Sequence, residues 1–131
     1  MTAKDCPSSQ LAMNVRAHLE TARKRGARVV ISAITLTEVL RGDPRRDAAV
    51  HRVLSRTSVL PVTPEIARTS GELLGRTGLS GHRYAIDAVV AVTALQQARP
   101  VVLLTSDPGD MNQLVEEPDR PKNQRVTVVH V

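Results

Sequence analysis

The chain has 131 residues, of which 41% are hydrophobic, and it carries a formal net charge of +5. This length fits a single domain that is large enough to bury its own core. Tyr84 is the only aromatic residue, so the core must be aliphatic, and stacking on single-stranded bases is nearly excluded.

The cysteine content, the N-terminal residues and the charge indicate the cellular compartment and the class of partner. Cys6 is the single cysteine, which excludes an internal disulfide and a cysteine-based zinc site and suits a reducing compartment. The first ten residues lack the apolar region of a signal peptide, and no uncharged stretch is long enough to span a bilayer. We therefore expect a soluble cytoplasmic protein with no membrane partner. The positive charge favours a nucleic-acid partner, although an arginine-rich solvated surface explains it equally well.

Apolar spacing, prolines and glycines predict helices alternating with short strands. Asp43-Pro44 and Thr63-Pro64 are typical helix starts, and Pro61 places its strand at a sheet edge. In chain order we expect an irregular lead at 1–10, a helix at 11–25, a strand at 28–32, a short helix at 33–40, a helix at 44–55, a strand at 58–62, a helix at 64–76, a loop at 78–83, a helix from Tyr84, a strand at 101–104, a short helix from 108 to 115, and a strand at 126–131.

This alternation favours an α/β domain with a mainly parallel sheet, in which functional sites lie beyond the carboxyl ends of the strands. Three acidic residues fall near that edge. Glu38 follows the strand at 28–32, Asp107 follows the strand at 101–104, and Asp87 lies near the start of its helix. We expect their side chains to converge.

Each acid also has a structural interpretation. Thr35 to Glu38 fits a capping box, and Asp107-Pro108 fits a helix N-cap, with Asp110 complementing the helix dipole. Asp87 differs, because it is a lone acid on a helix that is apolar on nearly every side, where an ionised carboxylate is costly unless it is compensated. The conjunction of the three favours a site.

Three carboxylates without a basic partner nearby in the sequence suit a hard divalent cation such as Mg²⁺ or Mn²⁺. Such ions serve phosphodiester hydrolysis, because they activate a water molecule and stabilise charge on the phosphate. The sequence contains neither a phosphate-binding P-loop nor the serine elbow of α/β-hydrolases, so nucleoside triphosphatase and serine hydrolase activities have no support.

The three acids lie in the segments Thr37–Gly42 (TEVLRG), Ile86–Ala94 (IDAVVAVTA) and Leu104–Asp107 (LTSD). Together these segments resemble the second, third and fourth acidic motifs of PIN-domain ribonucleases, most closely the VapC-type toxins of bacterial toxin–antitoxin pairs. Each motif is loose, but their order and spacing make the set fairly specific. The resemblance covers about residues 11–131 and implies a three-layer α/β/α fold with a mainly parallel sheet.

The resemblance also implies an activity and its residues. Glu38, Asp87 and Asp107 would bind Mg²⁺ or Mn²⁺ and carry catalysis, with Asp110 helping at the metal site. The reaction would be hydrolysis of RNA, and Thr105 or Ser106 would orient a carboxylate or water. The family usually forms homodimers and pairs with an antitoxin. The sequence also offers three arginines for RNA phosphate contacts, although a solvated helix end explains them as well: Arg41, Arg45 and Arg46.

One family element is missing. PIN domains open with an apolar strand that ends in an aspartate and lies in the middle of the sheet, whereas Met1–Lys4 is short and polar, and Asp5 is a poor substitute for the missing ligand. We therefore expect the first central strand to be missing or irregular, with unpaired strand edges and weaker cation binding. Three explanations stay open: a true start upstream of Met1, a degenerate relative, or a strand lent by another chain.

Two functions remain in competition. The first is a metal-dependent endoribonuclease toxin, with activity impaired by the missing acid. The alternative is a catalytically inactive PIN-like protein that binds antitoxin or RNA. A structural DNA-binding module is a weaker third, because a helix-turn-helix signal is absent.

Overall fold

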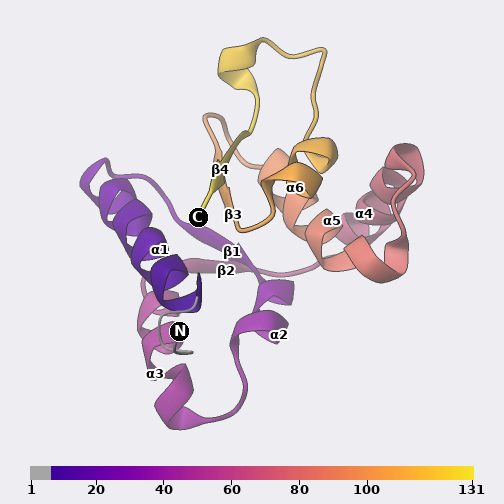
Figure 1. Ribbon diagram of the computed structural model, residues 1–131. Coiled ribbons are helices and arrows are strands. Elements are labelled where there is room, and N and C mark those ends of the chain that lie inside the picture. The colour runs from indigo at the N-terminus through magenta and orange to yellow at the C-terminus, as the bar shows by residue number, and fades with distance from the viewer. Residues whose placement is uncertain (1–6) are drawn as a thin grey trace.

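The computed structural model describes residues 7–131, with side chains described from Asn14 onward. It confirms an α/β domain with parallel strands (Figure 1). In chain order the elements are α1 (Pro7–Lys24), β1 (Val30–Ser32), the 3₁₀ turn η2 (Ala33–Thr35), α2 (Leu36–Val39), α3 (Pro44–Leu54), β2 (Ser58–Leu60), α4 (Pro64–Thr77), α5 (Gly81–Leu95), β3 (Val102–Thr105), α6 (Pro108–Leu114), the 3₁₀ turn η3 (Lys122–Gln124) and β4 (Thr127–His130).

The strands are shorter than or shifted by one residue from those expected, and the strand expected at 58–62 ends at Leu60, so Pro61 lies outside it. Two helix starts also differ from the sequence-based expectation. Helix α1 begins at Pro7 rather than near residue 11, so the expected irregular lead is wrong for residues 7–10; proline is well tolerated in a first helical turn, where its missing N–H has no helical partner. Residues 1–6, including Asp5, lie outside the described residues. Helix α5 begins at Gly81, so residues 81–83 are helical rather than part of a loop.

The strands form two separate parallel pairs. In the first pair, β1 lies beside β2 with Val30 opposite Ser58, and in the second, β3 lies beside β4 with Val102 opposite Thr127. Within residues 7–131 no strand joins β1 to β3, so the sheet is divided where the sequence led us to expect a missing central strand. Each of these two strands therefore has one edge without a strand partner in the described part of the chain.

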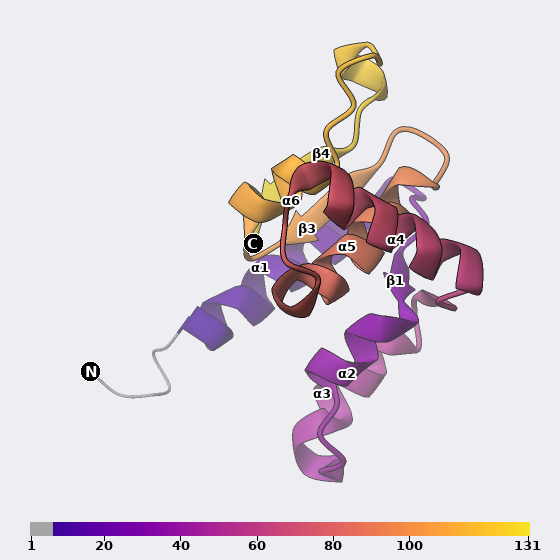
Figure 2. The same ribbon diagram turned by 90° about the vertical axis from the view of Figure 1, so that its right-hand side faces the viewer.

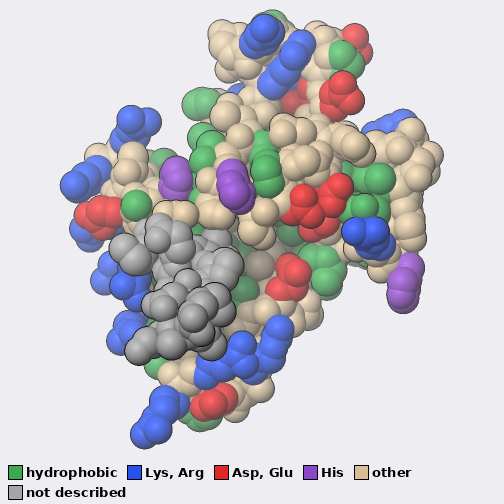
Figure 3. Space-filling model, in the orientation of Figure 1, with side chains coloured by type: hydrophobic (Ala, Val, Ile, Leu, Met, Phe, Trp, Pro, Cys, Tyr) green, Lys and Arg blue, Asp and Glu red, His purple; other side chains and the backbone are tan. Residues whose placement is uncertain are grey.

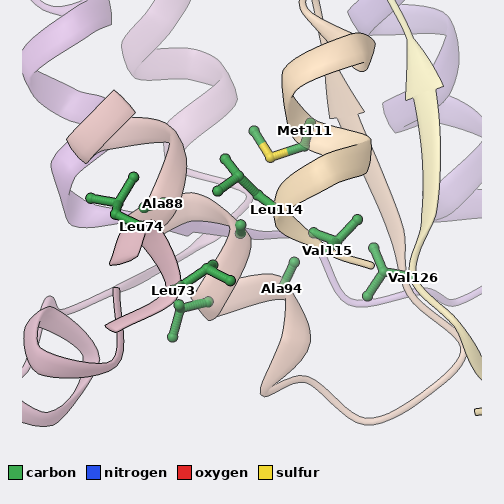
Figure 4. Packing of buried hydrophobic residues seen from close by; sticks show 10 residues of the cluster. Leu73, Leu74, Ala88, Ala94, Met111, Leu114, Val115 and Val126 are labelled. Atoms are coloured by element: carbon green, nitrogen blue, oxygen red, sulfur yellow. The ribbon is translucent and has the colours of Figure 1, made fainter. Parts of the chain in front are cut away.

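The buried core lies on one side of this division. Side chains from α4, α5 and α6 pack together, and Val126 joins them just before β4 (Figure 4). Leu114 is only 1% exposed, and Ala88 and Ala91 of α5 are completely buried. Among the described side chains, none of the buried hydrophobic residues comes from α2, α3, β1 or β2.

Helix α5 links the two halves, because it packs against α4 and α6 on the core side and also against β1 and η2. Most of the chain between α6 and β4, residues 116–125, extends away from the rest of the molecule in both ribbon views (Figures 1 and 2). Arg99 anchors the base of this extension: its guanidinium donates to both oxygens of Glu117, at 2.6 and 3.2 Å, and to the Gln124 carbonyl at 2.7 Å.

Candidate active site

Glu38 reaches its position through a tight turn after β1. The Ser32 hydroxyl accepts a hydrogen bond from the Ile34 amide at 3.4 Å, η2 follows, and α2 then presents Glu38 to solvent. The capping box expected as an alternative is not formed, since the Thr35 side chain makes no cap hydrogen bond. Within residues 14–131 the Glu38 carboxylate has no hydrogen-bond donor, so it is available to a ligand.

Asp107 follows β3 after one residue, Ser106, and its carboxylate does not cap α6. The other two starts of this kind do make the cap: Asp43 accepts from the Arg45 amide at 3.1 Å, and Thr63 accepts from the Ile66 amide at 3.1 Å. The backbone N–H of Asp107 donates to the Thr105 hydroxyl at 3.0 Å, and its side chain is exposed. Asp107 therefore occupies the expected N-cap position of α6, but its side chain does not cap the helix.

Asp87 lies on α5 beside the completely buried Ala88 and is itself half-buried. Burial raises the pKa of its carboxyl, and the negative charges of Glu38 and Asp107 raise it further. Three acids from different parts of the chain therefore lie close enough to repel one another, and no positive charge contributes to the pKa shift of Asp87.

The three acids line one cavity of about 490 Å³, which we call the acidic cavity. Thr105 and Ser106 also line it, while aliphatic side chains such as Val39 and Val90 form much of the remaining wall. Acidic side chains stand beside a hollow near the middle of this face, with basic side chains around them (Figure 3). The structure thus brings Glu38, Asp87 and Asp107 to the same opening.

Asp110 lies next to this group without lining the acidic cavity. A hydrogen bond to the Asp107 side chain raises the pKa of Asp110, and burial and the charges of Asp107 and Asp87 act in the same direction. Arg83 opposes this shift from the first turn of α5. The Asp110 and Asp107 side chains are therefore close enough to interact directly.

A metal ion fits the chemistry of these residues. Carboxylate and hydroxyl oxygens are the ligands that Mg²⁺ and Mn²⁺ prefer, and these ions retain several waters, so they need few protein ligands. Within residues 7–131, no group of three or more acidic, histidine or cysteine side chains is already close enough to hold an ion. Because like charges repel, the acids around the acidic cavity would have to draw together around a cation.

The three arginines predicted as phosphate contacts lie outside the acidic cavity. The Arg41 guanidinium folds back onto its own turn and donates to the carbonyls of Thr37 and Leu40, at 3.0 and 2.8 Å. Arg45 and Arg46 are exposed at the start of α3. Their phosphate contacts remain a proposal.

Sequence reasoning missed Asp47. This buried carboxylate accepts hydrogen bonds from the backbone amides of Arg41, at 3.0 Å, and Gly42, at 2.9 Å. It thereby fixes the turn that follows Glu38, in which Gly42 adopts a φ of +82°. Its sequence signal, an acid in the first turn of a helix, is too common to reveal such a contact.

The comparison with protein families decides the identity. A family model described as PIN domain matches residues 8–114, which is most of the chain. This chain belongs to the PIN-domain family. PIN domains are generally metal-dependent nucleases that act on RNA or DNA. Searches of curated proteins and of solved structures returned no match to this PIN domain. No helix in its described part combines the length and apolar character needed to cross a membrane.

Proposed function

We propose that this PIN domain is an endoribonuclease of the VapC toxin type, dependent on Mg²⁺ or Mn²⁺ and active in the cytoplasm. The observation that carries the proposal is the acidic cavity, to which Glu38, Asp87 and Asp107 contribute from three separate elements. The order of the three acidic motifs supports the toxin assignment. A cognate antitoxin, a homodimer and a domain spanning about residues 11–131 belong to the same proposal.

In this mechanism Glu38, Asp87 and Asp107 would hold the cation, and Asp110 would support Asp107 through their hydrogen bond. A divalent ion there would supply an activated water molecule and charge stabilisation of the phosphate. Thr105 holds the Asp107 backbone through its hydroxyl, and Ser106 lies exposed at the cavity, where it orients water or a carboxylate. Arg41, Arg45 and Arg46 bind the RNA backbone outside the cavity.

The divided sheet supports reduced activity. A strand between β1 and β3 would carry the fourth acid of the family motif, and within residues 7–131 none is present. One carboxylate fewer weakens cation binding. The same observation favours a second candidate function, in which the protein binds antitoxin or RNA without cleaving it.

RNA cleavage separates the two candidates. We expect the purified protein to cleave RNA with Mn²⁺ or Mg²⁺ but not with EDTA, and D87N to lose at least about 100-fold in rate, because Asn cannot replace a charged ligand. D119N is the matched control, since Asp119 is exposed and lies outside the acidic cavity. A folded wild type that binds RNA without cleaving it would instead establish the binding protein.

The toxin assignment has its own test. Induced expression in a bacterial host should arrest growth with the wild type and not with D87N at equal protein levels. Growth arrest by both proteins would separate toxicity from nuclease activity and contradict the toxin mechanism.

A further inference from the structure

Arg83 stands beside the acidic residues of the site, on α5. It is the third residue of this helix and precedes Asp87 by four positions, which places both on the same helical face about 6 Å apart along the axis. Its side chain is exposed, whereas Asp87 is half-buried. Arg83 therefore lies on the solvent side of Asp87, toward the approach to the acidic cavity.

The Arg83 guanidinium packs over an aromatic ring, and its N–H groups have no hydrogen-bond acceptor among residues 14–131. Its central carbon lies 5.3 Å from the centroid of the Tyr84 ring, and Tyr84 in turn packs against the core. Within residues 14–131 Arg83 makes no side-chain hydrogen bond or ion pair. Arg41 and Arg99, by contrast, use their guanidinium groups on carbonyls and carboxylates. The donors of Arg83 are therefore free for a ligand.

An arginine at this position destabilises the start of α5. The N-terminal end of a helix carries partial positive charge, which favours acids, yet the first turn of α5 contains no acid and the Ser80 side chain makes no cap hydrogen bond. Its charged side chain is instead that of Arg83. A residue that opposes local stability in this way is expected mainly at functional positions.

We propose that Arg83 binds a phosphate of the substrate backbone at the approach to the acidic cavity, on the solvent side of Asp87. This inference deepens the proposed nuclease function and depends on it. Arginine suits the role, because its planar group donates two parallel hydrogen bonds to phosphate oxygens.

The proposal predicts that removing the Arg83 side chain strengthens the binding of a divalent cation and weakens the binding of RNA. Without substrate, Arg83 repels a divalent cation, so R83A should bind Mn²⁺ about two- to five-fold more tightly than the wild type. With substrate, the phosphate loses a charged contact, so RNA cleavage should fall by about 10- to 100-fold. A purely structural defect would weaken both ligands together and lower the melting temperature.

The experiment compares the wild type, R83A, R83K and R76A. R76A is the matched control, since Arg76 is exposed on α4 and makes no side-chain hydrogen bond or ion pair within residues 14–131. Mn²⁺ affinity is measured by calorimetry without RNA, and kcat/KM and RNA affinity over a range of salt concentrations. Lysine keeps the charge but loses the paired hydrogen bonds, so we expect cleavage by R83K to fall between that of the wild type and that of R83A. R83A should lower the salt slope of RNA binding by about 1.

The experiment distinguishes a failure of the Arg83 proposal from a failure of the proposed nuclease function. An active wild type together with an R83A variant that cleaves and binds RNA equally well would overturn the role of Arg83 alone. A wild type that neither binds nor cleaves RNA would overturn the proposed function, and the Arg83 assignment with it.

Discussion

Glu38 and Asp87 lie on different helices, yet their carboxylates face one cavity and interact across it. Burial raises the pKa of Asp87, and the charge of Glu38 is the next largest contribution. This relationship costs stability when both groups are ionised, so folding alone does not explain it. A divalent cation between the two would convert the repulsion into binding energy.

We therefore expect the Asp87 carboxylate to lower the stability of the metal-free protein near neutral pH. Its pKa is raised on folding, so its contribution to stability is most favourable below the ordinary aspartate pKa and is lost as pH rises through the folded-state value. We expect metal-free D87N to melt at the same temperature as the wild type or higher near neutral pH. Saturating Mn²⁺, at about 100 times its Kd, should stabilise only the wild type, by about 2.7 kcal/mol. Thermal melts with and without Mn²⁺ measure both effects; a metal-free D87N that melts well below the wild type would contradict this account.

Asp47 should show the reverse pH dependence. The hydrogen bond from the Arg41 amide lowers the pKa of this buried carboxylate, and the Gly42 amide adds to the shift. Its stabilising contribution is thus present above the ordinary aspartate pKa and is lost as pH falls through the lowered folded value. We expect D47N to melt below the wild type near neutral pH, with the gap narrowing in acid. D119N serves as the control, and a gap that is independent of pH would refute the assigned cause.

Arg99 should matter for stability rather than chemistry. Its side chain is 12% exposed and forms a two-pronged ion pair with Glu117 besides its contacts to carbonyls. R99A leaves the Glu117 carboxylate without its main partner, so we expect a loss of about 2–4 kcal/mol in unfolding free energy.

R120A is the matched control for Arg99, because Arg120 contacts the same glutamate at 2.9 Å from a half-exposed position. It should cost less than about 1 kcal/mol. Urea denaturation measures both variants. RNA cleavage by R99A should match the wild type at temperatures where it stays folded, and equal losses of stability in the two variants would contradict the burial argument.

Local sequence signals were sufficient to predict much of the fold. Asp43-Pro44 and Thr63-Pro64 do start helices with side-chain caps, because the cap and the proline lie within one helical turn. Asp107-Pro108 has the same signal but makes no side-chain cap, because the Asp107 carboxylate interacts with the Asp110 side chain rather than with the backbone amides of α6. Sequence reasoning could not separate these cases.

The site was predictable where strand ends determined it. Glu38 and Asp107 follow parallel strands, so their approach to Asp87 follows from the α/β architecture. The contact of Asp47 with the Arg41 amide depends on the path of one turn, and the place of Arg83 beside the site depends on α5 starting at Gly81 rather than after the expected loop. Neither feature has a periodic signature in the sequence.

The most direct test of the central claim is a crystal structure of the protein grown with Mn²⁺, with the ion located by its anomalous scattering. We expect one strong peak in the acidic cavity, coordinated by oxygens of Glu38, Asp87 and Asp107, and no peak there in D87N. Crystals soaked in saturating Mn²⁺ that show no peak among these three carboxylates would contradict the account.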